Sequence, residues 1–216
     1  MIARNRPLLN IVILAAGFSS RLGEPKARAT VRGASLLART LRTLGPFARS
    51  PLLVVIPPRV DRRRLAADTR RVRFLPNARR SEGMSTSVRR GIAAARYSSG
   101  VLLLPVDLVD LQGRDLSRLI SRWLGARRRV VGRHLQGGAA TPLVLPRHLY
   151  ARALGITGDR GLREFNRALP RESVSLVHMP SAAADVDTRQ DLEDARRRIR
   201  PPSRGPSYAR AVCTKR

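Results

Sequence analysis

The sequence predicts one α/β domain with a mostly parallel sheet, and three observations support this. A length of 216 residues suits a single domain that buries a substantial core. Short β-branched runs alternate with segments at helical spacing, as in folds whose parallel strands are joined by helices. The first run, 11–14, is apolar throughout, which fits a strand covered on both faces. The domain is expected to span residues 8–200.

Apolar runs mark the expected strands. They are short and rich in Val, Ile and Leu, which favours strands over long helices. A glycine-rich loop is expected at 136–140, and this middle section is where we expect a substrate loop. The expected strands are residues 10–14, 52–56, 72–75, 101–107, 130–132, 142–145 and 174–178.

Helices are expected between these strands. Residues 35–44 have leucines at helical spacing and arginines on the other face. Ser85 is expected to cap a helix that runs to about residue 95, and Thr188 to cap the last helix. The other expected helices are residues 116–124, 147–154 and 162–169.

The segment after the first strand, 15–26, predicts a site for anions. Its first residues are small, so backbone N–H groups can approach a ligand and form a concavity for negative charge. Arg21 and Lys26 add positive charge, and Lys26 is one of only two lysines among the 43 basic residues. The spacing of Gly17, Gly23 and Lys26 matches neither the Walker A motif nor GxGxxG.

Carboxylates follow two later segments and predict a metal site. Asp107 ends a buried strand, where open α/β sheets bind ligands. Mg²⁺ is typically held by one or two carboxylates plus substrate phosphates, so Asp107 is the expected first ligand. Alternation in an extended segment points Asp185 and Asp187 to the same side, and one of them is the expected second ligand. A loop-capping role for Asp107 stays open, with Asp110 as a weaker competitor.

Three small or polar residues surround the expected start of the helix at 85. Asn77, Gly83 and Ser87 lie where a second helix N-terminus would bring more N–H donors to the first loop. Asparagine and serine can also recognise a base or ribose through neutral hydrogen bonds. The alternative, in which Asn77 is a turn residue and the serine a cap, stays open.

The net charge of +28 suggests nucleic-acid binding, but the sequence does not favour it. Aromatic residues make up only 4% of the chain, so a stacking platform for single strands is not expected. The arginines are spread over most predicted helices instead of forming one motif. Nucleic acid is therefore not the expected partner.

The cysteine, histidine and apolar content argues against disulfides, structural zinc and membrane spans. Cys213 is the single cysteine and the three histidines are far apart, so neither disulfides nor a structural zinc site are expected. No apolar run reaches the length of a membrane span or resembles a signal peptide, so a cytoplasmic location without membrane contact is expected. Residues 201–216 form a basic Pro/Ser/Arg tail that is expected to be disordered.

Five segments carry a resemblance to a known family. LAAGFSSRLGEPKA, residues 14–27, resembles the signature LAAGxSxRxGxPK of nucleotidyltransferases that activate sugars and cofactors. Residues 77–92, 159–165 and 185–192, with the strand that ends in Asp107, follow the order seen in the molybdenum cofactor cytidylyltransferase and guanylyltransferase group. The resemblance covers roughly residues 10–199.

This resemblance implies a fold, a reaction and a cofactor. The fold is a Rossmann-like three-layer sandwich of the nucleotide-diphospho-sugar transferase type. The reaction transfers CMP or GMP from the triphosphate to a phosphorylated pterin, with Mg²⁺ and release of pyrophosphate. Members of the cytidine branch have LAAG where the guanosine branch tends to have LAGG, so Ala16 favours CTP. A molybdoenzyme or its chaperone is a candidate recipient of the product.

The resemblance also assigns roles to the residues above. Arg21, Lys26 and Asp107 are the expected catalytic residues, with metal ligands from Asp107 and one of Asp185 and Asp187. The expected nucleotide-binding residues are Leu14, Ala15, Ala16, Gly17, Ser19, Arg21, Lys26, Asn77, Gly83 and Ser87.

Two segments differ from the family pattern. Leu108-Val109 stands where the family has Gln or Met followed by Pro, and Ala140-Thr141-Pro142 stands in place of GHP. Both lie where the second substrate is expected. A nucleotidyltransferase with another phosphorylated acceptor therefore stays open, as do guanylyl transfer and, as a different class, a basic nucleic-acid-binding protein.

Overall fold

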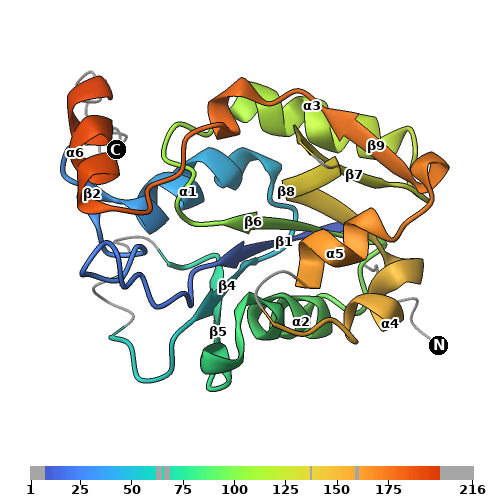
Figure 1. The fold of residues 1–216 in the computed structure, drawn as a ribbon, viewed down its shortest axis with the longest axis horizontal. Helices are drawn as coiled ribbons and strands as arrows, with labels where there is room; N and C mark the ends of the chain where they lie inside the picture. The colour runs from blue at the N-terminus through green and yellow to red at the C-terminus, as the bar shows by residue number, and fades with distance from the viewer. Residues whose placement is uncertain (1–7, 62–64, 66–68, 137, 159–160, 200–216) are drawn as a thin grey trace, which may run out of the picture.

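A seven-stranded sheet forms the centre of the computed structural model, which describes residues 8–61, 65, 69–136, 138–158 and 161–199 (Figure 1). The strand order is β5-β4-β1-β6-β8-β7-β9. β8 runs antiparallel to its neighbours β6 and β7, and the other neighbouring pairs are parallel. The strands are β1 (Leu9–Leu14), β4 (Leu52–Ile56), β5 (Val72–Pro76), β6 (Gly100–Pro105), β7 (Val130–Leu135), β8 (Gly138–Pro146) and β9 (Val174–Val177).

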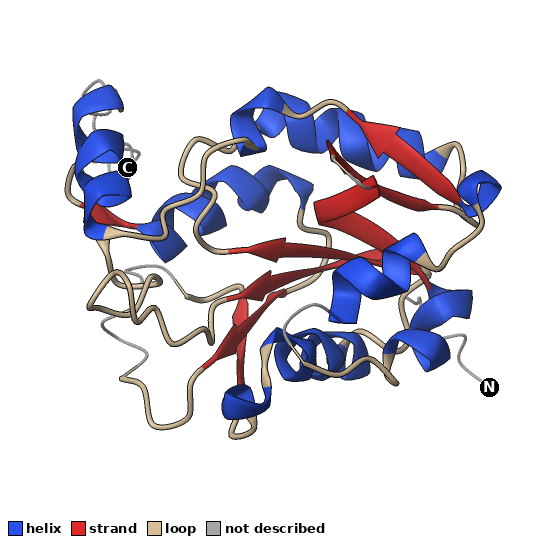
Figure 2. Cartoon of the chain, viewed as in Figure 1, coloured by secondary structure: helices blue, strands red, loops and turns tan. Residues whose placement is uncertain are grey.

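Helices cover both faces of this sheet, which confirms the predicted three-layer α/β fold with a mostly parallel sheet (Figure 2). α1, α3 and α6 contribute to the core on one face, and α2, α4 and α5 to the core on the other. The helices are α1 (Leu36–Leu44), α2 (Met84–Ala94), α3 (Gly113–Leu124), α4 (Tyr150–Ala153), α5 (Gly161–Arg167) and α6 (Arg189–Arg198).

β1 shows why the sheet is buried on both sides. Ile11 and Ile13 belong to the core beneath α1 and α3, whereas Val12 and Leu14 belong to the core beneath α2. Successive side chains of a strand point to opposite faces, so an uninterrupted apolar run suits a strand between two helical layers. β1 is an interior strand between β4 and β6, and its carboxyl end leads directly into the loop of residues 15–26, called here the small-residue loop.

Local side chains set two helix starts, and the cap at Thr188 is as predicted. Ser35 caps α1 through a hydrogen bond from the Ala38 N–H, at 3.1 Å. Thr188 caps α6 in a capping box with Asp191, whose carboxylate accepts from the Thr188 N–H at 2.7 Å. The capping box therefore fixes where α6 begins, and it also fixes the position of the residues just before Thr188.

Two predictions were wrong. Ser85 does not cap α2, because Gly83 is the N-cap residue and Ser85 lies in the first turn with its hydroxyl buried. Gly83 adopts φ of 100°, which glycine reaches most easily. The predicted loop at 136–140 is shorter, since residues 138–140 pair with β7 as the start of β8.

Other predictions differ from the structure in extent or fall on residues that it does not describe. The predicted helix at 147–154 is a 3₁₀ turn followed by the short α4. The predicted basic tail, 201–216, lies outside the described residues, as does part of the segment at 159–165. No helix in the described part of the chain is long and apolar enough to cross a membrane.

Candidate active site

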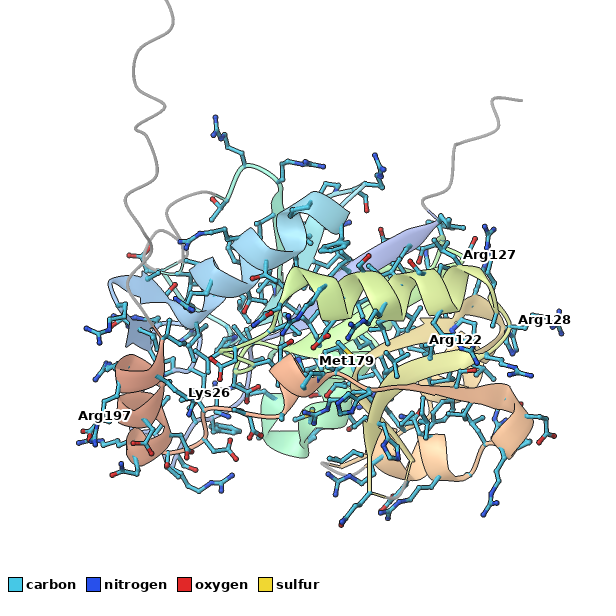
Figure 3. The ribbon with its side chains drawn as sticks, turned by 90° about the horizontal axis from the view of Figure 1, so that it is seen from above. Lys26, Arg122, Arg127, Arg128, Met179 and Arg197 are labelled. Carbon is cyan, nitrogen blue, oxygen red and sulfur yellow. The ribbon has the colours of Figure 1, made fainter. Side chains whose placement is uncertain are left out.

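A cavity of about 300 Å³ lies at the carboxyl ends of β1 and β6. In an open α/β sheet this edge is the usual place for a ligand, because the loops that leave neighbouring parallel strands meet there. Figure 3 labels Lys26 on the side of the molecule that carries α6. The cavity is lined by Leu14, Ala15, Ala16, Gly17, Phe18, Ser19, Ser20, Arg21, Lys26, Arg80, Gly83, Met84, Ser87, Pro105, Val106, Asp107 and Asp187.

Lys26 is the centre of the charged part of this cavity. Its Nζ lies 2.5 Å from Asp107 Oδ2 and 2.5 Å from Asp187 Oδ1. The side chains of Lys26 and Asp107 are only 17% and 14% exposed, so solvent screens this pair weakly. Arg21 adds a second cation, with Nη2 at 3.0 Å from Asp187 Oδ2, but its side chain is exposed. Two cations and two carboxylates from distant segments therefore meet in one place.

The pKa values of the three central groups follow from this packing. Burial works to lower the pKa of Lys26, but the charges and hydrogen bonds of Asp107 and Asp187 outweigh it and raise the value above 10.5. Burial raises the pKa of Asp107, and the Lys26 charge opposes that rise. The hydrogen bond from Lys26 has the largest effect on the pKa of Asp187 and lowers it. Burial opposes this, and the charges of Lys26 and Arg21 lower the pKa further.

Asp107 has the features expected of a metal ligand. Its Oδ1 is buried and has no hydrogen-bond partner among the described residues, although buried carboxylate oxygens are normally paired. Asp187 presents a second carboxylate in the same cavity. No group of three or more His, Cys, Asp or Glu side chains gathers in the described part of the chain. Two carboxylates in one cavity suit Mg²⁺, which retains substrate oxygens and water as its other ligands. Among the described residues, the other three oxygens of this pair contact Lys26 or Arg21, so Asp107 Oδ1 is the one left for a metal.

A short segment between β9 and α6, residues 179–187, brings Asp187 to the cavity. Ser181 donates its backbone N–H and its hydroxyl to the fully buried Asp115 carboxylate, at 3.0 and 2.6 Å. Further along, the Val186 N–H donates to the Asp107 carbonyl at 3.1 Å. These bonds place Asp187 beside Lys26.

Asp185 does not join this group. It is exposed and is absent from the cavity lining, although its charge raises the pKa of Asp107. The buried Val186 separates the two aspartates. Of this pair, Asp187 contacts Lys26, and no contact between Asp185 and Lys26 is found among the described residues. Of the two candidates for the second metal carboxylate, the geometry favours Asp187.

The small-residue loop is arranged as an anion site with one amide fewer than expected. The Ala15 N–H donates to the Val55 carbonyl at 2.9 Å, so this amide is engaged by the neighbouring strand. The N–H groups of Ala16 and Gly17 have no hydrogen-bond acceptor among the described residues and belong to residues that line the cavity. Ser19 accepts the Lys26 N–H on its hydroxyl at 3.1 Å, which holds the loop closed.

The residues at the start of α2 divide into lining and support. Gly83 and Ser87 line the cavity. Asn77 is buried outside its lining, and its amide donates to Thr86 and Ser87 hydroxyls at 2.9 and 3.0 Å. The Asn77 side-chain oxygen, Oδ1, accepts the Arg79 backbone N–H at 3.1 Å. Asn77 thus joins β5 to α2, as in the turn-residue alternative.

Sequence reasoning missed Phe18 and Arg80, which also line the cavity. The Arg80 guanidinium carbon lies 4.0 Å from the centre of the Phe18 ring, and Arg80 Nη1 donates to the Ala16 carbonyl at 3.2 Å. An aromatic residue inside a loop of small residues was the available signal for Phe18. Arg80 gave none, because arginines are frequent throughout the chain.

Comparison with known proteins identifies the family of this chain. Residues 11–174 match the MobA-like NTP transferase domain. A protein of Opitutus terrae named "Probable molybdenum cofactor guanylyltransferase" is 29% identical over 178 residues, which are 80% of this chain and 81% of that protein.

Solved structures share the fold. Rv0371c from Mycobacterium tuberculosis H37Rv has a TM-score of 0.70 at 23% identity, covering 89% of this chain and 100% of its own. The 2-C-methyl-D-erythritol 4-phosphate cytidylyltransferase of Thermus thermophilus has a TM-score of 0.61 at 24% identity, covering 87% and 97%. Since the family match spans most of the sequence, the chain belongs to the MobA-like NTP transferase family and is a nucleotidyltransferase.

Proposed function

We propose that this enzyme transfers a nucleoside monophosphate from a nucleoside triphosphate to the phosphate of a molybdenum cofactor precursor. The observation that supports the proposal best is Lys26 held between Asp107 and Asp187 beside the small-residue loop. This arrangement supplies a cation for phosphate oxygens and two carboxylates for a divalent metal. The name of the Opitutus relative supports a pterin-type acceptor.

The transfer needs no nucleophile from the protein. A phosphate oxygen of the acceptor attacks the α-phosphorus, the bond to the β-phosphate oxygen breaks, and pyrophosphate leaves. The acceptor oxygen is already ionised near neutral pH, so no proton has to be removed from it. The protein's task is in-line positioning and stabilisation of the charge that develops.

Individual residues suit separate parts of that task. The N–H groups of Ala16 and Gly17 bind triphosphate oxygens, and Arg21 and Lys26 neutralise the charge on the phosphates. Asp107 and Asp187 are the residues that would hold Mg²⁺, which when bound acts as a Lewis acid on phosphate oxygens. Pairing with these carboxylates keeps Lys26 protonated before substrate binds.

Two donors are candidates, each supported by one observation. CTP is favoured by Ala16 in the LAAG sequence, which resembles the cytidine branch of the family. GTP is favoured by the relative's name, guanylyltransferase. The side chain of Ala16 is buried beside the cavity, so it affects the shape of the loop and not its charge.

A turnover assay tests the proposal. The full chain is incubated with Mg²⁺, molybdenum cofactor or molybdopterin, and each of the four nucleoside triphosphates in turn. Pyrophosphate release and the mass of the nucleotide-linked product are measured together. We expect product with CTP or GTP only in the presence of both acceptor and metal. Tight nucleotide binding without product would contradict the proposed acceptor, and no nucleotide binding would contradict the proposed reaction.

A further inference from the structure

Two side chains of the cavity, Phe18 and Arg80, have no role in the proposed transfer. They lie beside Lys26, Asp107 and Asp187, called here the lysine–carboxylate cluster. Phe18 projects from the small-residue loop, and its side chain is among the exposed large apolar groups, at 58%. Arg80 approaches from the 3₁₀ turn Arg80–Glu82 that precedes α2 and lies over the Phe18 ring. No hydrogen bond or ion pair in the described residues joins Arg80 to Lys26, Asp107 or Asp187.

Arg80 retains hydrogen-bonding capacity at this position. The acid of its own turn, Glu82, is already bound by Arg79 through two hydrogen bonds of 2.6 and 2.7 Å. Arg80 contacts only neutral groups among the described residues, the Ala16 carbonyl and the Phe18 ring. A guanidinium has five N–H donors, so most of them stay available to a ligand in the cavity.

Phe18 and Arg80 together have the chemistry of a base-binding pair. An aromatic face stacks on any nucleobase, because every base has a π-face. The Arg80 guanidinium lies on the Phe18 ring at 4.0 Å, so a base that stacks there displaces it, and its N–H groups then face the edge of the base. The guanidinium can only donate hydrogen bonds, so it favours a base edge that presents a carbonyl oxygen over the adenine edge, where an amino donor stands beside the ring-nitrogen acceptors. Guanine, cytosine and uracil have such an oxygen and adenine has none.

We propose that Phe18 and Arg80 bind the nucleobase, with Phe18 stacking on it and Arg80 selecting bases that carry a carbonyl oxygen against adenine. This inference rests on the proposed function, because it takes the lysine–carboxylate cluster as the triphosphate end of the cavity. Either CTP or GTP satisfies it. It assigns Phe18 to affinity for any base and Arg80 to discrimination between bases.

Calorimetric titration of the full chain separates base contacts from phosphate contacts. The ligands are CTP, GTP, UTP, ATP and inorganic tripolyphosphate, each with Mg²⁺. Tripolyphosphate has no base, so it reports the phosphate end alone. Phe18→Leu is expected to weaken all four nucleotides by about tenfold and leave tripolyphosphate within about twofold.

Arg80→Gln is expected to act differently. It should weaken CTP, GTP and UTP by about tenfold while ATP changes by less than about threefold, so the preference against ATP collapses. Arg90→Gln is the matched control, since Arg90 is an exposed arginine on the helix that follows, α2, and does not line the cavity. It should bind all five ligands as the unchanged chain does.

The outcomes distinguish this inference from the proposed function. Loss of tripolyphosphate binding in Arg80→Gln, in parallel with loss of CTP, would assign Arg80 to phosphate and overturn the inference alone. Unchanged nucleotide affinity in both variants would also overturn it. Failure of the unchanged chain to bind any nucleotide would instead overturn the proposed function. Tripolyphosphate binding also shows that each variant is folded, and Arg80→Gln tests selectivity even where Phe18→Leu does not fold.

Discussion

Two regions of this molecule concentrate positive charge in different ways. In the cavity, Lys26 and Arg21 face Asp107 and Asp187 at 2.5 to 3.0 Å. At the end of α3 and in the turn that leads to β7, four exposed arginines have no acidic partner among the described residues. They are Arg122, Arg127, Arg128 and Arg129.

The two regions also lie at opposite ends of the sheet. The arginine turn, residues 127–129, precedes β7, so it lies at the amino end of that strand, whereas the cavity lies at the carboxyl ends of β1 and β6. Figure 3 shows Lys26 and the pair Arg127 and Arg128 on opposite sides of the molecule. In a chain with a net charge of +28, positive charge by itself does not identify a site. A cation held by carboxylates in a cavity does.

The largest effect should come from removing Lys26, the cation that is paired with carboxylates in the cavity. Lys26→Met keeps the approximate volume of the side chain but leaves Asp107 and Asp187 without their shared partner. We expect a loss of about 10² to 10³-fold in kcat, because losing one preorganised charge contact typically costs about 3 kcal/mol of transition-state stabilisation. Pyrophosphate release with saturating nucleotide and acceptor measures it.

The matched control for this variant comes from the arginine turn. Arg128→Gln also removes one positive charge, but from an exposed position outside the cavity. It should retain full activity within about twofold. Equal losses in the two variants would mean that net charge, and not the geometry around Lys26, controls turnover.

The stability of the chain at alkaline pH should depend on Tyr150 and not on the many arginines. Arginines stay protonated at high pH, but the Tyr150 hydroxyl is buried, which raises its pKa to about 12 against an opposing hydrogen bond with Ser98 at 3.1 Å. The folded chain therefore keeps this proton above the unfolded pKa of about 10. Stability is intact below pH 10 and declines as pH rises towards 12.

The predicted size of this decline is about 1 kcal/mol between about pH 9 and about pH 11. Urea unfolding at the two pH values measures it. Tyr150→Phe cannot ionise, so its loss of stability over the same interval should be smaller by that amount. An equal decline in both proteins would show that Tyr150 does not contribute to alkaline unfolding.

A further contrast divides the two aspartates that precede α6. Asp187→Asn removes a carboxylate that contacts both Lys26 and Arg21, and we expect a loss of about 10- to 100-fold in kcat/KM. Asp185→Asn changes an exposed residue outside the cavity lining, and should cost less than about fivefold. Turnover at several Mg²⁺ concentrations measures both. A larger loss for Asp185→Asn would reverse the choice made from the geometry.

This contrast also shows where sequence reasoning ends. Strand alternation placed both aspartates on one side, but the segment is not a strand. Its path is set by Ser181 on Asp115 and by Val186 on the Asp107 backbone, which are contacts between distant parts of the chain. No local pattern predicts such contacts, so the sequence could not choose between Asp185 and Asp187.

Other features were predictable because their causes are local. The apolar runs of β1 and β4, the caps at Ser35 and Thr188, and an acid just beyond β6 all follow from nearby residues. The start of α2 was missed because the backbone conformation of Gly83, and not a polar side chain, begins that helix. Arg80 was missed because its role depends on a contact with Phe18 across the cavity.

The smallest effect on activity should come from the arginine turn, whose positive charges have no acidic partner among the described residues. Replacing Arg127, Arg128 and Arg129 together by Gln removes three exposed cations that lie at the amino end of β7. Salt screens charges beyond about 8 Å at physiological ionic strength, so turnover should stay within about twofold. Retention on heparin should fall to lower salt, because adhesion to polyanions depends on exposed basic groups. If turnover instead fell by about tenfold or more with unchanged stability, this turn would belong to the catalytic machinery, and the contrast between the two regions would fail.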